Sequence, residues 1–362
     1  MDYEIISIST SDKQGKHLSK RAWDESRPNS DAALSDIMRV NAPVNEMPSV
    51  LLNIYSSVIE REVIAGIREH SMWASTSRVD NIWDFELVEG TPKSGVVYAE
   101  ECRSAMIMKK VNGVKQDQFR LHLPMTAETH YFVRLNMRAC AILHMYFLHL
   151  ATLNHETAEI FNTAASDFKA IAMEMGMEDP TVYGFVDILG ESVHQDNENF
   201  SRQMGSFTMV KHWAPFSLRA HMIRHRLIFL RDGLTDWIRD GIHLRSMGDK
   251  ISIEAVASND SWRGIYSKRS CWIAQADLWN PLLRLIINEI GGTKDLLPCA
   301  DGSCPFEKDA SLRLEVGKDP NPPCPRHAEL NGIKLNDEQM NSIKSEIESG
   351  DREDIWREYT NG

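Results

Sequence analysis

The chain has 362 residues, of which 42% are hydrophobic and 25% charged, and its formal net charge is −12. This mix is typical of a globular protein, and the length favours two domains of about 150 residues with additions. The acidic balance argues against a protein that coats nucleic acid non-specifically, although it allows a local basic cleft.

Compartment and membrane association are predicted from what the sequence lacks. No apolar run approaches the ~20 residues of a membrane span, and the N-terminus has no signal-peptide pattern. Six cysteines are too few for a disulfide scaffold, which favours a reducing compartment. We therefore expect a cytoplasmic protein that does not associate with a membrane.

The first half of the chain is predicted to contain strands followed by long helices. Alternating apolar residues predict strands at Tyr3–Ile8, Val50–Tyr55, Trp83–Val88 and Gly95–Tyr98, and a hairpin of Met106–Val111 with Gln118–Leu123 around Asn112-Gly113. Helical spacing predicts helices at Ile59–His70, Glu128–Leu153 and about Glu156–Met175. The polar segment before Asn41 has no firm assignment. Asp179-Pro180 is the predicted break between modules.

The second half repeats this order. A strand is expected at Phe207–Trp213, a helix at Phe216–Leu230, and a further helix at about Tyr266–Asn288. The same order of elements thus occurs twice: a strand, an Arg/His-rich helix, a loop and a long helix with a central Arg. This repetition indicates an internal duplication. The alternative is a pair of unrelated α+β pieces.

The predicted fold class is α+β, with two tandem modules of strands and long helices around a pseudo-two-fold axis. We assign residues 1–178 to the first module, 179–295 to the second, 296–332 to a zinc-binding segment and 333–362 to an acidic helical tail. The charge of the tail is typical of a solvated surface and indicates no function.

The most functional-looking stretch is basic. Lys211–Arg245 holds seven Lys or Arg and four His against three Asp, with Arg224-His225-Arg226 at its centre. Arginine suits phosphate because its planar fork donates two parallel hydrogen bonds and stays charged. The alternative is that these basic residues pair with Asp232, Asp236 and Asp240.

These residues resemble a known family, the flavin-dependent thymidylate synthases. Phe207–Arg226 is similar to the stretch that enters the family signature RHRxxSxNExSxRY, and Ile67–Val79 resembles a reduced form of it. Leu123–Thr126 and Phe132–Ala139 resemble the family's LPL…T segment and the N-A-R-S helix after it, and Ser267–Ser270 is similar to that helix. The resemblance covers about residues 41–290, in two copies.

The resemblance implies an enzyme that transfers one carbon to C5 of the uracil of dUMP from methylenetetrahydrofolate, with a flavin hydride completing the methyl group. It implies FAD binding by Arg224, His225, Arg226, Arg68 and His70, and dUMP binding by Ser77, Arg78, Asn136, Arg138 and Arg269. It implies no cysteine nucleophile, and the sequence identifies no catalytic residue. Because family members are tetramers with sites between subunits, a duplicated chain is expected to form a homodimer.

Neither copy carries the full signature. After Arg226 the Ser, Asn-Glu and Ser-x-Arg-Tyr elements are missing, and the first copy has Arg68-Glu69-His70 where the triplet is expected. Either the copies divide the contacts, or the family's reaction has been lost. Two alternatives follow: a flavin-independent transferase acting on 5-substituted deoxyuridine in DNA, and a non-catalytic nucleotide-binding subunit.

A separate pattern indicates a structural zinc site. Cys299, Cys304, Cys324 and His327 follow the spacing C-x4-C-x19-C-x2-H among several prolines. Three thiolates and one imidazole suit tetrahedral Zn²⁺, which would stabilise this region. The alternative is a proline-rich loop with incidental reduced cysteines.

Overall fold

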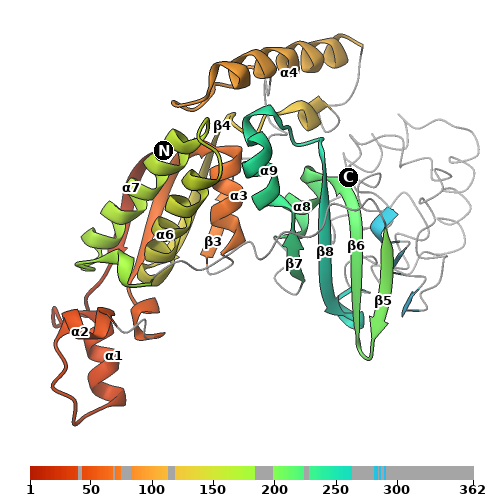
Figure 1. Ribbon diagram of the computed structural model, residues 1–362. Coiled ribbons are helices and arrows are strands. Elements are labelled where there is room, and N and C mark those ends of the chain that lie inside the picture. The colour runs from red at the N-terminus through yellow and green to blue at the C-terminus, as the bar shows by residue number, and fades with distance from the viewer. Residues whose placement is uncertain are drawn as a thin grey trace, which may run out of the picture. The chain divides into compact units, whose positions relative to one another are not determined.

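The computed structural model combines helices with two four-stranded sheets (Figure 1). It describes residues 1–39, 43–67, 70–74, 83–112, 119–183, 199–223, 228–262, 281–283, 285–286 and 289–290. The chain divides into two compact units. Unit 1 comprises Met1–Asp196, Pro215–Arg226 and Arg231–Ile253, and unit 2 comprises Asn197–Ala214, Leu227–Leu230 and Glu254–Gly362. Within the described ranges, no helix combines the length and hydropathy that crossing a membrane requires.

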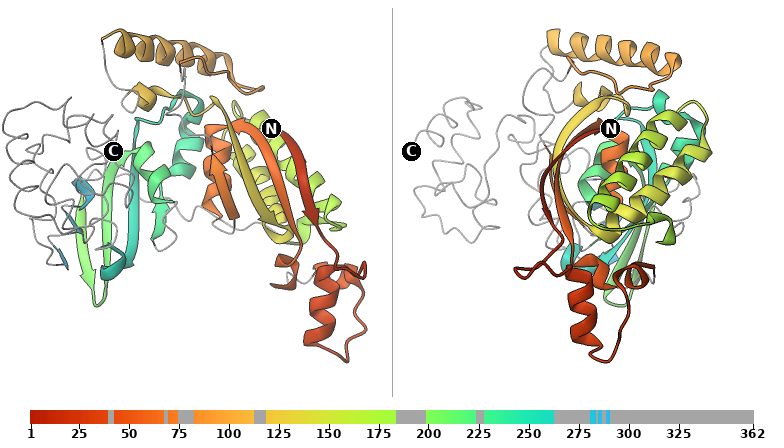
Figure 2. Two further views of the ribbon diagram at one scale, coloured as in Figure 1. Left: turned by 180° about the vertical axis from the view of Figure 1, so that it is seen from behind. Right: turned by 90° about the vertical axis from the view of Figure 1, so that its left-hand side faces the viewer.

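The first sheet has the strand order β1-β2-β4-β3, with antiparallel neighbours throughout. Its strands are β1 (Asp2–Ser9), β2 (Ser49–Ser57), β4 (Glu128–Asn136) and β3 (His70–Ala74). Two long helices, α6 (Met137–Leu153) and α7 (Ala158–Glu174), cover one face of this sheet, as Figure 2 shows. The short helix η3 (Pro180–Tyr183) follows them. Alternate residues of β2 are buried, so the sheet and the two helices enclose a common core.

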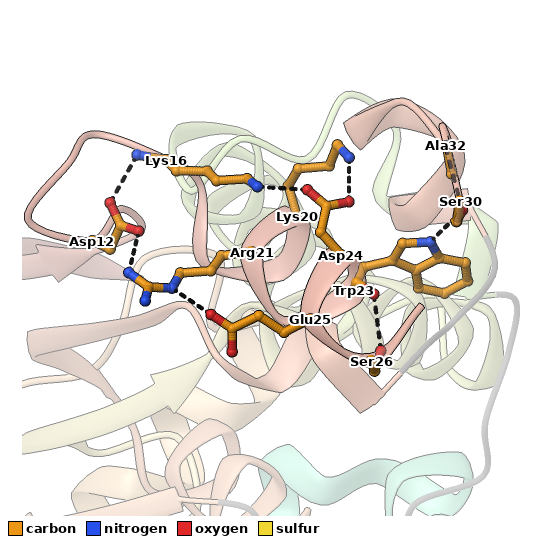
Figure 3. Close-up of polar contacts among 10 residues, drawn as sticks. All are labelled: Asp12, Lys16, Lys20, Arg21, Trp23, Asp24, Glu25, Ser26, Ser30 and Ala32. Atoms are coloured by element: carbon orange, nitrogen blue, oxygen red, sulfur yellow. Dashed lines mark hydrogen bonds and ion pairs between the residues drawn. The ribbon is translucent and has the colours of Figure 1, made fainter. Parts of the chain in front are cut away.

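The segment before Asn41, which the sequence left unassigned, contains α1 (Leu18–Ser26) and α2 (Leu34–Arg39). The short helix η1 (Pro43–Glu46) lies after it. Charged pairs tie α1 to the loop before it, as Figure 3 shows. Arg21 donates to Asp12 at 2.7 Å, and Lys16 pairs with Asp24 at 2.5 Å. Because polar pairs hold this segment together, its apolar residues do not show the spacing from which helices can be predicted.

Helix α3 (Val58–Gly66) follows β2 without a loop. Ser57 and Glu60 form a capping box, in which each side chain accepts a hydrogen bond from the other residue's backbone N–H. The predicted helix Ile59–His70 was therefore right about the element but too long, because His70 already begins β3.

Several predictions between Trp83 and Leu153 were wrong. A single helix, α4 (Lys93–Val111), replaces the predicted strand at Gly95–Tyr98 and the first strand of the hairpin. The short helix η2 (Arg120–His122) lies where the second strand of the hairpin was predicted. The predicted strand at Trp83–Val88 is absent, and its one β-type pairing is an isolated bridge at Leu87. Glu128–Asn136 is strand β4 rather than the start of a helix, and the helix begins only at Met137.

The second sheet has the order β5-β6-β8-β7. Its strands are β5 (Phe200–Met204), β6 (Phe207–Pro215), β8 (Lys250–Ser258) and β7 (Phe229–Asp232). The helices of this region are α8 (Phe216–Met222), α9 (Leu234–Gly241) and the short η4 (Ile242–Leu244). The predicted helix Phe216–Leu230 was too long, because Phe229 lies in β7. Most of the predicted helix Tyr266–Asn288 lies outside the described residues.

The two sheets repeat one strand order. In each, a nine-residue strand leads directly into a helix, β2 into α3 and β6 into α8. In each, a three-residue 3-10 helix precedes a nine-residue strand, η2 before β4 and η4 before β8. The internal duplication itself stays a prediction.

Candidate functional site

The first turns of α3 and α8 are held in the same way. In α3, Val58 N–H donates to the Ala127 carbonyl at 2.9 Å and Ile59 N–H to the Met125 carbonyl at 3.0 Å. In α8, Phe216 N–H donates to Asp249 at 2.8 Å and Ser217 N–H to Met247 at 2.9 Å, again through backbone carbonyls. Each helix start is therefore anchored by the segment that precedes β4 or β8.

The two anchoring segments also bind each other. Met125 N–H donates to the Arg245 carbonyl at 2.9 Å, and Met247 N–H donates to the Leu123 carbonyl at 2.9 Å. Pro124 and Ser246 form an antiparallel bridge between these bonds. The arrangement has local two-fold symmetry, and it places the first turns of α3 and α8 next to each other.

One turn further along, a buried ion-pair cluster joins the two helices. Arg219 of α8 donates from Nη1 to Glu62 Oε2 of α3 at 2.9 Å, and from Nε to Asp232 Oδ2 at 2.8 Å. Arg61 donates from Nη2 to Glu62 Oε1 at 3.0 Å and from Nη1 to Thr129 Oγ1 at 3.1 Å. Arg219, Glu62 and Asp232 are 0%, 2% and 3% exposed. Charges at this depth are tolerated only when they are paired, as these are.

The electrostatics of the cluster favour a charged arginine. Burial alone would lower the pKa of Arg219, but the carboxylates of Asp232 and Glu62 outweigh it and raise that pKa. In contrast, burial raises the pKa of Glu60, which favours its neutral form. Among the described residues, Nη2 of Arg219 has no hydrogen-bond acceptor, so one buried donor remains unused.

The described part of the chain contains three of the residues that the resemblance implied. His70 begins β3, and its Cα is paired with that of Leu135, one residue before Asn136. Asn136 caps α6 by accepting from Ala139 N–H at 2.7 Å. Arg138, with 26% of its side chain exposed, forms an ion pair with Glu46. The structure thus brings His70, Asn136 and Arg138 to one end of the first sheet, and it assigns Asn136 and Arg138 structural contacts.

The other implied residues lie outside the described ranges. They are the cofactor-binding Arg68, Arg224, His225 and Arg226, the substrate-binding Ser77, Arg78 and Arg269, and the zinc ligands Cys299, Cys304, Cys324 and His327. In the part that is described, no three His, Cys, Asp or Glu side chains gather as metal ligands would. Cys102 and Cys140 are buried free thiols, and burial raises the pKa of each.

The basic stretch from Lys211 to Arg245 is partly explained by local pairing. Arg219 pairs with Asp232, and Arg239 pairs with Asp236 at 2.7 Å, as the structural alternative predicted. Sequence reasoning missed Glu62 as the second partner of Arg219. Its one sequence signal is the charged run Glu60-Arg61-Glu62 inside an otherwise apolar helix, and that signal does not point to a partner so distant in the chain.

Comparisons with known proteins yield distant structural likenesses. No protein-family model and no curated protein sequence matches the chain. It is similar to the UMP/dUMP methylase PolB from Streptomyces cacaoi bound with 5-Br dUMP, at 14% identity and a TM-score of 0.37, over 48% of this chain and 90% of that one. The same enzyme with 5-Br UMP gives 13% identity and a TM-score of 0.35, over 48% and 89%. Thymidylate Synthase X (ThyX) from Helicobacter pylori with FAD and dUMP gives 16% identity and a TM-score of 0.31, over 46% and 99%.

Proposed function

We propose that this chain is a transferase that adds a one-carbon unit to C5 of a pyrimidine deoxynucleotide, with dUMP as substrate and FAD as cofactor. The observation that carries the proposal is the element pattern over Phe207–Ile223, which lies within the stretch that resembles the flavin-dependent thymidylate synthases. Strand β6 runs directly into α8, which ends at Met222 just before Arg224-His225-Arg226. The buried ion pairs of Arg219 fix α8 five residues before this triplet.

The residues of the triplet suit the cofactor chemically. Arg224 and Arg226 offer forked cationic donors for the two linked phosphates of FAD, and His225 adds a ring donor. When bound and reduced by an external two-electron donor, the flavin would supply the hydride that completes the methyl group. The protein supplies position and electrostatics, and methylenetetrahydrofolate is the proposed carbon donor.

We assign substrate binding to Ser77, Arg78 and Arg269. Asn136 and Arg138 are weaker candidates, because Asn136 uses its side-chain oxygen to cap α6 and Arg138 would have to leave Glu46 to reach a phosphate. We also propose that the chain consists of two diverged copies of one module and that it forms a homodimer. The repeated strand order supports the duplication.

The first test is the visible absorbance of the purified protein, before and after FAD and dUMP are added. A bound flavin spectrum that shifts with dUMP supports the proposal. The second test is the release of tritium from dUMP labelled at C5, with FAD, a reductant and methylenetetrahydrofolate present, because methyl transfer must replace that hydrogen.

Arg226→Ala should abolish flavin binding, whereas Arg239→Ala, which removes an exposed arginine already paired with Asp236, should not. A protein that binds neither FAD nor dUMP would overturn the proposal. Salt-dependent binding of DNA by such a protein would then favour a transferase that acts on DNA.

A further inference from the structure

Helix α4 is apolar on two opposite sides. Its inner side packs on η2 and η4 through the buried residues Gly95, Ala99, Cys102 and Met106. Its outer side carries exposed apolar residues, namely Val96, Val97, Ile107, Met108 and Val111, which are between 42% and 76% exposed. None of the helices and strands described in unit 1 lies on that outer side (Figures 1 and 2). A helix that is apolar all round is typical of one that is packed on both sides.

The outermost residues of α4 form a stripe that is symmetric about its centre. Val97, Ser104 and Val111 are seven residues apart, about two helical turns, so they lie on one line along the helix, with Met108 beside it. Val97 and Val111 lie at equal distances on either side of Ser104. A surface of this kind can pack on its own copy across a two-fold axis, where two different residues contact each other twice. Serine at the centre is small enough for two helices to approach to about 8 Å.

The charges of α4 favour an antiparallel pair over a parallel one. Glu100 and Glu101 lie in the first half of the helix, and Lys109 and Lys110 lie in the second half. An antiparallel pair centred on Ser104 places Glu100 two residues, or about 3 Å along the helix axis, from the partner's Lys110. A parallel pair would place each glutamate beside its own copy, and like charges repel.

Two of these charged side chains are already held in place within the chain. Nζ of Lys110 lies 3.3 Å from the centroid of the Trp83 ring, and Oε1 of Glu100 accepts from Nε of Arg103 at 3.3 Å. Arg103 in turn donates to the backbone carbonyls of Trp83 at 2.7 Å and Phe85 at 3.0 Å. Side chains that are ordered before association lose less conformational entropy when they form an interface.

We propose that α4 is the docking surface for a second copy of this chain, with the two α4 helices packed antiparallel around Ser104. This inference rests on the homodimer of the proposed function and names the surface that forms it. Val97 contacts the partner's Val111, and Glu100 pairs with the partner's Lys110. The contact extends along the 19 residues of α4, a length of about 28 Å.

Disulfide formation between copies tests the position of the two-fold axis. A residue on the axis meets its own copy, so Ser104→Cys should give a covalent dimer under mild oxidation, seen by non-reducing electrophoresis. The matched control is Ser94→Cys, which replaces an exposed serine of the same helix ten residues from the axis. It should form no more covalent dimer than the wild type does.

Sedimentation equilibrium of the full chain tests the contacts. Met108→Glu places a carboxylate opposite the partner's Glu100 at two symmetric positions, and it should raise the dimer dissociation constant by about 100-fold. Met173→Glu changes an exposed methionine of α7 in the same way and should leave the constant unchanged. Glu100→Lys and Lys110→Glu should each raise it by about 10-fold, and the two combined should restore it, because the pair is then reversed.

The outcomes separate this surface from the homodimer and from the transferase. A dimer that Met108→Glu does not weaken would overturn the α4 surface and leave a homodimer formed elsewhere. Equal cross-linking of Ser104→Cys and Ser94→Cys would overturn it as well. A wild-type chain that stays monomeric up to about 100 μM would overturn both the surface and the homodimer. The transferase would still stand on its own test, the visible absorbance with FAD and dUMP.

Discussion

Replacing Glu62 by alanine should strongly destabilise unit 1. Glu62 is 2% exposed and holds two arginines, Arg61 through Oε1 and Arg219 through Oε2. Arg219 would keep Asp232, whereas among the described residues Arg61 would keep the hydroxyl of Thr129 alone. The substitution therefore leaves a buried positive charge without its counterion.

The expected loss of unfolding free energy is about 3–5 kcal/mol, the usual cost of removing one partner from a buried ion pair. For a unit of roughly 150–250 residues, each kcal/mol of lost unfolding free energy lowers the thermal unfolding midpoint by about 2–4 °C. The midpoint should therefore fall by roughly 6–20 °C. Glu62→Gln, which keeps the shape and a weaker acceptor, should lose less.

Urea unfolding followed by circular dichroism and tryptophan fluorescence measures this loss. The matched control is Arg239→Ala, which breaks an ion pair of 2.7 Å whose arginine is 53% exposed. An exposed ion pair contributes at most about 1 kcal/mol to the free energy of unfolding. The two variants therefore compare a buried and an exposed ion pair of similar length. If Glu62→Ala cost no more than Arg239→Ala, the cluster would not hold α3 against α8 and the reasoning above would fail.

Three further predictions concern other parts of the chain. Asn136→Ala should cost about 1 kcal/mol in urea unfolding, because α6 loses its cap at Ala139 N–H, whereas Asn136→Asp should cost much less; equal stability of both variants would contradict the capping role. Burial lowers the pKa of His243 despite the opposing carboxylate of Glu156, so the native state binds fewer protons than the unfolded state and stability should fall as pH drops below the ordinary value of 6.5. His243→Gln should flatten that dependence between about pH 5 and 7, and an unchanged slope would exclude His243 as its source. Elemental analysis should find one zinc per chain that Cys324→Ser removes, and a metal-free wild type would refute the zinc site.

Strands with clear alternation were predictable, and elements with conflicting local signals were not. β2 and β6 alternate buried and less buried residues, and the sequence located both to within two residues. Val96 and Val97 favour a strand locally, yet Gly95, Ala99 and Cys102 form one buried helical face of α4. Tertiary packing outweighs β-propensity there.

The candidate site was predictable only where local sequence determines it. The Arg-His-Arg triplet and the helix before it are contiguous, so a resemblance could find them. The bond from Arg219 to Glu62 spans 157 residues, and no local pattern specifies such a partner. The local sequence around Asn136 also did not predict that its side chain caps α6, and its role in substrate binding stays a prediction.

Unit 1 is built from three separate stretches of the chain, and this affects how it folds during translation. The unit needs Pro215–Arg226 and Arg231–Ile253 in addition to Met1–Asp196. On the ribosome, the N-terminal part emerges first. Until later residues arrive, Glu62 lacks Arg219, and the Leu123–Met125 segment that anchors α3 lacks its partner at Arg245–Met247. At about 5–20 residues per second, the nascent chain spends seconds in that state. Translation pausing before Ile253 should therefore lower the yield of folded protein, whereas pausing after it should not.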